Sequence, residues 1–260
     1  MIEMNHIQRY FPTAIRGNKA FHKYMLKEYL QFMILDYLST SVYAKKLSFI
    51  GGTNLRLIHG IDRFSEDIDF DSKDMSREEF MEMTDEVLNF LRRNDFSVEA
   101  RDAPNPKISA FRRSFYFPEL LFKMNLSGHR DERFLIKIEA QDQGVAYRPD
   151  LVDVKGCGFF FPVLAPPLNV LCSMKLSALL TRSKGRDFYD SMFLLSQTEP
   201  DYEFLTARCG IGSQQELKAA ANKMLETTDI HKKSRDFEHL LFNPDNAKKI
   251  LRFGEFLKAL

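Results

Sequence analysis

The chain has 260 residues, of which 44% are hydrophobic and 28% are charged. This composition excludes a disordered chain, and no apolar run approaches the roughly 18 residues that a membrane span needs. The formal net charge is only +1, so the chain as a whole does not attract nucleic acid, and any such contact must come from a local basic patch.

The cysteines and the first residues bear on the cellular compartment. Cys157, Cys172 and Cys209 are odd in number, widely spaced and outside any CxxC motif, which indicates reduced thiols. The initial residues, MIEMNHIQRYF, lack the apolar core of a signal peptide. We therefore expect a cytoplasmic protein without membrane contact.

Residues 1–17 are mixed in character and predict an arm or a short cap, and residues 20–39 repeat apolar positions at helical spacing. A short apolar strand over residues 47–50 then ends in Gly51-Gly52-Thr53, and a helix-forming run follows at residues 54–59. Two glycines let the backbone approach a ligand closely, and the free N–H groups of a new helix favour an anion. This stretch predicts a phosphate-binding turn.

Apolar and charged residues alternate with period two just after this turn, which predicts a half-buried strand. Asp67, Asp69 and Asp71 share one face of it, and Ile68 and Phe70 share the other. Two carboxylates at i and i+2 beside a phosphate site supply the hard oxygen ligands with which Mg²⁺ is held against a triphosphate. The alternative is a surface hairpin that happens to carry acidic residues.

A helix is predicted from Ser76, a favourable N-cap, to Arg93. A mixed or antiparallel sheet should follow, separated by turn residues that include Pro104-Asn105-Pro106, with β-like segments at 96–101, 114–117, 120–126 and 133–141. Glu139 lies on the polar face of the last segment, where it could be a third carboxylate of the metal site. The alternative is that it alternates outward in an ordinary sheet.

Residues 152–167 contain two glycines and three prolines and cannot be helical for long, so they are the best candidate for a domain boundary. Helices are predicted beyond them, at residues 168–183, 186–197, 201–208, 213–226 and, as one or two helices, 234–260. We therefore predict an α+β fold, with a mixed β-sheet and flanking helices over residues 1–160 and a helical domain over residues 161–260.

Cations gather at the start of this helical half. Lys175 and Arg182 share one face of a predicted helix, and Arg186 and Asp190 lie one turn apart in the next. Such cations could neutralise the phosphates of a nucleotide and so complement the carboxylates. A solvated basic face with an intrahelical ion pair explains the same residues equally well.

Two blocks of the sequence together resemble a known family. The first block is Gly51-Gly52-Thr53, Leu55-Arg56 and Arg63-Phe64-Ser65-Glu66-Asp67-Ile68-Asp69-Phe70. The second block is Lys175, Ala178, Arg182, Arg186, Asp187, Tyr189 and Asp190, in the pattern K..A...R...RD.YD. Both resemble the AbiEii/AbiGii toxin family, a branch of the DNA polymerase β-like nucleotidyltransferase superfamily.

The resemblance implies a nucleotidyltransferase-like sheet and a helical domain that completes the active site. It also implies Mg²⁺-dependent transfer of NMP from an NTP to an acceptor hydroxyl, with RNA, and specifically the tRNA 3′ end, as the expected acceptor. The protein would then be the toxin of a bacterial toxin–antitoxin or abortive-infection pair, with a cognate antitoxin as its partner.

Site residues follow from the same match. The expected metal ligands are Asp67, Asp69 and Glu139. The expected catalytic residues are Asp67, Asp69, Glu139, Lys175, Asp187 and Asp190. The expected nucleotide- and phosphate-binding residues are Gly51, Gly52, Thr53, Arg56, Ser65, Lys175, Arg182 and Arg186. Two other functions stay open: a small-molecule nucleotidyltransferase of the aminoglycoside-modifying kind, and a binding module that holds nucleotide without catalysis.

Overall fold

The computed structural model describes residues 3–101 and 110–260, and the chain groups into two units. Unit 1 comprises residues 1–60, 64–143 and 150–165, and unit 2 comprises residues 61–63, 144–149 and 166–260. The chain leaves unit 1 for the last time after Ala165. This point lies a few residues beyond residue 160, where the sequence predicts the end of the first domain. The predicted Pro104-Asn105-Pro106 separator lies outside the described residues.

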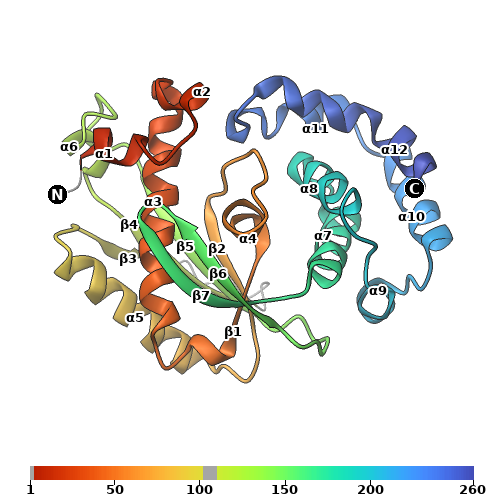
Figure 1. Ribbon diagram of the computed structural model, residues 1–260, viewed down its shortest axis with the longest axis horizontal. Helices are drawn as coiled ribbons and strands as arrows, with labels where there is room; N and C mark the ends of the chain where they lie inside the picture. The colour runs from red at the N-terminus through yellow and green to blue at the C-terminus, as the bar shows by residue number, and fades with distance from the viewer. Residues whose placement is uncertain (1–2, 102–109) are drawn as a thin grey trace. The chain divides into compact units, whose positions relative to one another are not determined.

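The described part of unit 1 contains a seven-stranded mixed sheet of order β3-β4-β5-β2-β1-β7-β6 (Figure 1). Its strands are β1 (Leu47–Ile50), β2 (Asp67–Ser72), β3 (Glu99–Arg101), β4 (Phe111–Tyr116), β5 (Leu135–Gln141), β6 (Asp150–Gly156) and β7 (Phe159–Ala165). The β2–β5 and β1–β7 pairs are parallel, and the other neighbouring pairs are antiparallel. The predicted α+β fold with a mixed sheet is confirmed.

Helices accompany this sheet within unit 1. They are α1 (Met4–Gln8), α2 (Thr13–Arg16), α3 (Lys19–Ser39), the 3₁₀ helix η1 (Ala44–Lys46), α4 (Gly51–Leu57), α5 (Arg77–Arg93) and α6 (Leu120–Lys123). The long helix α3 and the Ser76-capped helix α5 agree with the sequence prediction, and Ser76 and Glu79 form the reciprocal hydrogen bonds of a capping box. Residues 1–17 are not a free arm, because Ile7, Phe11 and Ile15 are buried.

One face of the sheet is apolar and lies under α3 and α5. Phe49 is opposite Phe70, Phe70 is opposite Ala140, and Ala140 is opposite Phe111, so this row crosses four strands on one side of the sheet. The ring of Phe80 in α5 contacts that of Phe111, with centroids 5.6 Å apart. Side chains one residue along these strands must point to the opposite face.

Two segments of unit 1 differ from the sequence prediction. Residues 120–126, predicted as a strand, form the short helix α6, which starts after Glu119 in a left-handed conformation and ends before Asn125 in another. An apolar run this short does not distinguish helix from strand. The predicted boundary region instead forms the β6–β7 hairpin, whose two-residue turn, Cys157-Gly158, has positive φ at both positions, as a type I′ turn requires.

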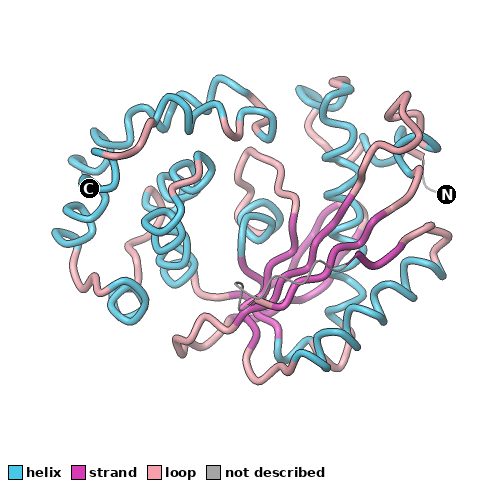
Figure 2. The backbone as a smooth tube through the Cα atoms, turned by 180° about the vertical axis from the view of Figure 1, so that it is seen from behind, coloured by secondary structure: helices cyan, strands magenta, loops and turns pink. Residues whose placement is uncertain are grey.

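The described residues of unit 2 are helices and loops, whereas the strands belong to unit 1 (Figure 2). The helices are α7 (Leu168–Arg182), α8 (Gly185–Leu195), α9 (Tyr202–Cys209), α10 (Gln214–Glu226), α11 (Ile230–Arg235), η2 (Glu238–Leu240), η3 (Pro244–Arg252) and α12 (Phe253–Ala259). The first four confirm their predicted positions. The region from residue 234 onward is broken into shorter pieces than predicted, two of them 3₁₀ helices.

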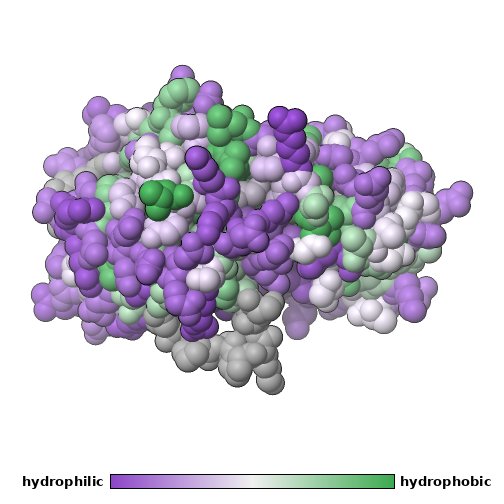
Figure 3. Space-filling model, turned by 90° about the horizontal axis from the view of Figure 1, so that it is seen from below, coloured by the Kyte–Doolittle hydropathy of each residue, from purple (hydrophilic) through white to green (hydrophobic). Residues whose placement is uncertain are grey.

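The surface is that of an ordinary water-exposed protein on the face shown in Figure 3, where hydrophilic side chains dominate and apolar ones form small separate groups. No helix in the described part of the chain combines the length and apolar character that crossing a bilayer requires. Cys157, Cys172 and Cys209 are free thiols. Burial raises the pKa of the Cys172 thiol to about 12, so it is an inert core residue.

Candidate active site

The second face of the sheet carries the predicted carboxylates. Asp69 of β2 is directly opposite Glu139 of β5, and Glu139 is directly opposite Arg112 of β4. One step along the strands, Asp67 is opposite Lys137. Because side chains alternate along each strand, all five residues lie on the face away from α3 and α5.

Gly51 explains how Asp69 is accommodated beside helix α4. This helix begins at Gly51 itself and not, as predicted, three residues later. Gly51 has φ +84°, and a Cβ added there would lie 2.1 Å from the Oδ2 atom of Asp69. Glycine is therefore required at residue 51 for two reasons: it adopts the positive φ, and it leaves room for the carboxylate of Asp69.

Asp67 is held by its backbone and by a neighbouring cation. Thr53 is buried, and its hydroxyl donates a hydrogen bond to the backbone carbonyl of Asp67. The carboxylate oxygens of Asp67 lie 3.4 and 3.5 Å from Nζ of Lys137. The hydroxyl of Thr53 thus fastens α4 to β2, and its predicted contact with phosphate stays a prediction.

Glu139 is engaged by a guanidinium. Arg112 Nε lies 2.7 Å from Glu139 Oε1, and Arg112 Nη2 lies 3.0 Å from Oε2, so the pair is bidentate. The hydrogen bond to Glu139 raises the pKa of Arg112 above its ordinary value, and the nearby charges of Asp67 and Asp69 contribute in the same direction. Arg112 therefore faces all three carboxylates.

The donor set suits a hard divalent cation, since it consists of carboxylate oxygens from adjacent positions of two paired strands. Within residues 3–101 and 110–260, however, no three His, Cys, Asp or Glu side chains converge closely enough to hold a metal. Glu139 pairs with Arg112, and Asp67 lies beside Lys137. The role of Asp67, Asp69 and Glu139 as metal ligands stays a prediction.

Other predicted residues of this half lie inside the fold. Arg56 forms a bidentate pair with Glu28 of α3, with nitrogen–oxygen distances of 2.9 and 3.1 Å. Ser65 is buried, and its carbonyl accepts a hydrogen bond from Gln31. Asp71 is 1% exposed and accepts a hydrogen bond from the backbone N–H of Gln143, so it is a structural residue and not a third ligand.

Asp190 of α8 is the centre of a buried ion network in unit 2. It receives two hydrogen bonds of 2.7 Å from the guanidinium of Arg63 and one of 2.9 Å from Nζ of Lys175. Burial by itself would raise the pKa of the Asp190 carboxyl, but Arg63 and Lys175 outweigh it and hold this pKa at about 2. Lys175 and Asp190, both predicted as catalytic, are thus paired with each other inside the unit.

The second predicted acid of α8 is also paired. Asp187 is fully buried, accepts hydrogen bonds of 2.9 and 2.8 Å from Arg182, and accepts one from the backbone N–H of Lys184 at the start of α8. Arg186 is half-buried and forms no ion pair with any residue that the structure describes. Of the predicted phosphate-binding cations in this unit, Arg186 is thus the one not engaged by a carboxylate.

Three contacts escaped the sequence prediction. Lys137 alternates with Glu139 on one strand face, a signal that the sequence does contain. Arg63 was visible only as part of the family pattern, and its partner Asp190 is 127 residues away. Arg113, the neighbour of Arg112 on β4, is buried against α5, where it pairs with Asp85 at 2.8 Å.

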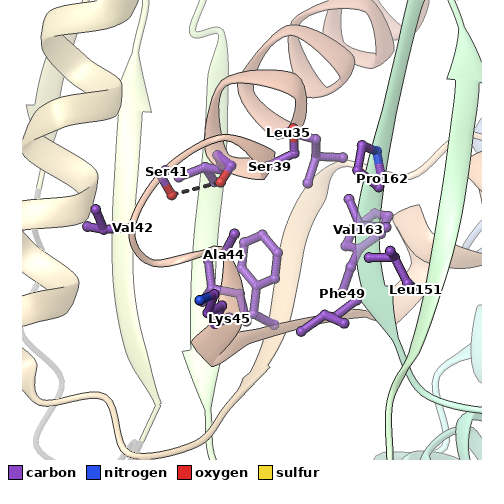
Figure 4. Close-up of a pocket in the computed structure, with 14 residues that line it drawn as sticks. Leu35, Ser39, Ser41, Val42, Ala44, Lys45, Phe49, Leu151, Pro162 and Val163 are labelled. Atoms are coloured by element: carbon purple, nitrogen blue, oxygen red, sulfur yellow. Dashed lines mark hydrogen bonds between the residues drawn. The ribbon is translucent and has the colours of Figure 1, made fainter.

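An apolar pocket of about 480 Å³ also lies in unit 1, between the end of α3 and strands β1, β2 and β7 (Figure 4). Its lining includes Leu35, Leu38, Phe49, Phe70 and Val163. Phe49 and Phe70 belong to the apolar row of the sheet, so the pocket is on the face opposite the carboxylates. It is not part of the candidate active site.

The family described as "Nucleotidyl transferase AbiEii toxin, Type IV TA system" matches residues 33–249, well over half of the chain. The chain belongs to this family. It is therefore an AbiEii nucleotidyltransferase, a toxin of the type IV toxin–antitoxin class, and this class implies a cognate antitoxin. Comparison with curated protein sequences gives no match.

Three solved structures have a similar fold. The nucleotidyltransferase toxin MenT4 (Rv2826c) of Mycobacterium tuberculosis H37Rv is 18% identical with a TM-score of 0.63, over 100% of this chain and 91% of that one. JHP933 of Helicobacter pylori is 16% identical with a TM-score of 0.54, over 91% and 90%. A putative nucleotidyltransferase of H. pylori is 16% identical with a TM-score of 0.52, over 89% and 92%. At identities this low, the comparisons establish a similar fold and no shared function.

Proposed function

We propose that this AbiEii toxin is a Mg²⁺-dependent enzyme that transfers NMP from an NTP to a hydroxyl group of RNA and releases pyrophosphate. The observation that carries the proposal is the register of β2 and β5, which sets Asp69 opposite Glu139 with Asp67 on the same face. The three carboxylates are also only partly buried, as groups that meet a solvated substrate must be.

Asp67, Asp69 and Glu139 are the residues that would hold Mg²⁺. Bound there, the ion would supply Lewis-acid polarisation of the reacting phosphate and charge neutralisation of the triphosphate. The protein would supply the fixed ligand positions, since Asp69 is confined by Gly51 and Asp67 by the Thr53 hydrogen bond.

The transfer itself forms a bond between the acceptor oxygen and the α-phosphorus and breaks the bond from that phosphorus to the bridging oxygen of pyrophosphate. Glu139 helps to activate the acceptor hydroxyl by taking its proton. Within unit 2, Lys175 and Arg182 already pair with Asp190 and Asp187, so Arg186 is the cation of that unit to which we assign phosphate binding.

The test is incubation of the purified protein with each radiolabelled NTP, Mg²⁺ and either total RNA or a panel of aminoglycosides. We expect label on RNA from one or a subset of the NTPs, and none when Mg²⁺ is replaced by EDTA. Label on an aminoglycoside and none on RNA would replace the RNA acceptor with a small molecule. Nucleotide binding without any transfer would contradict the enzymatic proposal.

A further inference from the structure

Two cations sit among the three carboxylates of the β-sheet face. Arg112 donates two hydrogen bonds to Glu139, and Nζ of Lys137 lies 3.4 Å from Oδ1 of Asp67. Both cations meet solvent, with side-chain exposures of 39% for Arg112 and 37% for Lys137, whereas Glu139 and Asp67 are less exposed, at 22% and 23%.

The charges of these five side chains nearly balance without any metal. Three carboxylates contribute −3 and the two cations contribute +2, which leaves a net charge of −1. A free divalent cation would meet repulsion from Arg112 and Lys137, and it could use Glu139 only after breaking the bidentate pair. A metal–triphosphate complex is itself anionic, so Arg112 and Lys137 would attract it and not repel it.

We propose that Arg112 is a positioning residue that occupies Glu139 in place of a metal, so that the site takes Mg²⁺ together with the nucleotide and binds the free ion weakly. This inference rests on the proposed function, because it concerns the same carboxylates.

The experiment measures the affinity of the purified full chain for Mn²⁺, a spectroscopic stand-in for Mg²⁺, with and without a non-hydrolysable α,β-methylene NTP. In the wild type we expect weak binding of Mn²⁺ alone and much tighter binding with the nucleotide. In Arg112→Ala we expect Mn²⁺ alone to bind at least about tenfold more tightly, because a unit positive charge a few ångströms from a divalent ion has been removed. The increase in Mn²⁺ affinity that the nucleotide causes should therefore be smaller in Arg112→Ala than in the wild type.

Two further variants separate charge from structure. Arg112→Lys keeps the charge and loses the two-pronged geometry, so its affinity for Mn²⁺ alone should stay near that of the wild type. Arg252→Ala removes a matched arginine, whose Nε lies 2.7 Å from Glu255 but on the exposed surface of unit 2, and should change nothing. Thermal unfolding of each variant confirms that the fold is kept.

The outcomes distinguish this inference from the proposed function. If the wild type binds Mn²⁺ with nucleotide but Arg112→Ala binds free Mn²⁺ no more tightly, the role of Arg112 is refuted while the metal site stands. Equal tightening in Arg112→Lys would also refute it, since the charge would not be the cause. If no variant binds Mn²⁺ even with nucleotide, the metal site and this inference fall together.

Discussion

At the scale of single residues, the candidate site depends on one glycine as much as on its acids. The carboxylate of Asp69 lies where a side chain at residue 51 would have to be. A glycine at the start of α4 therefore controls the position of a proposed metal ligand on strand β2. Gly51, the first residue of the predicted phosphate-binding turn, thus has a second, structural role.

Gly51→Ala should consequently lower transferase activity by about a hundredfold, because displacement of a reacting group by about 1 Å has an effect of that size. Gly60→Ala is the matched control. Gly60 also has positive φ, +72°, but nothing lies within 4 Å of an added Cβ. Both variants should lose about 1–2 kcal/mol of stability from backbone strain. Equal activities of the two variants would show that Gly51 does not position Asp69.

At the scale of elements, the sequence predicted best where a periodic pattern extends over a whole segment. Helices α3 and α5 and the alternation of β5 follow from apolar spacing, and the DxD strand β2 follows from it as well. The hairpin β6–β7 does not follow from the sequence, because the glycines and prolines of residues 152–167 indicate a domain boundary as readily as a tight turn. The ion pairs of Arg112 and Arg63 could not be predicted, since strand register and contacts between distant residues decide them.

Helices α7 and α8 are joined by the buried Asp190 network, and this makes a stability prediction. Asp190→Asn should destabilise the protein by about 3–5 kcal/mol, because it leaves Arg63 and Lys175 buried without their counter-charge. Asp245→Asn, which removes a fully exposed partner of Lys248, should have little effect in denaturant unfolding. Similar small effects of both substitutions would contradict the structural role of Asp190.

The pH dependence of the same group has a defined sign. The folded-state pKa of Asp190 is about 2, below the ordinary value of 3.8, so the unfolded chain binds more protons between these values. The stabilisation is therefore present above about pH 4 and is lost as the pH falls toward 2. The stability of Asp190→Asn should fall less steeply over this range than that of the wild type. Parallel pH profiles would show that Asp190 is not held ionised.

At the scale of the whole molecule, the net charge of +1 leaves RNA binding to local cations. Arg113 is buried and Arg112 pairs with Glu139, whereas Lys184, Lys232 and Arg235 are exposed in unit 2. A protein that grips several phosphates releases counterions, so binding to RNA should weaken steeply as salt rises.

We therefore expect RNA labelling to fall sharply between low and physiological salt, and Lys232→Ala/Lys233→Ala to lower RNA labelling more than NTP binding. The matched control is Lys218→Ala/Lys223→Ala, which removes the same charge from α10. RNA labelling that does not depend on salt would contradict a nucleic-acid acceptor. Equal losses of RNA labelling in the two double variants would show that Lys232 and Lys233 do not bind the RNA.

The central claim is that Asp67 and Asp69 hold the metal for transfer of a nucleotidyl group, and its most direct test compares NTP labelled at the α-phosphate with NTP labelled at the γ-phosphate. We predict that α-label appears on the acceptor and γ-label in pyrophosphate. Asp67→Asn and Asp69→Asn should abolish both signals while unfolding at nearly the wild-type temperature, because these carboxylates serve the ligand and not the core. Transfer of the γ-label, or near-normal transfer by either variant, would contradict the account.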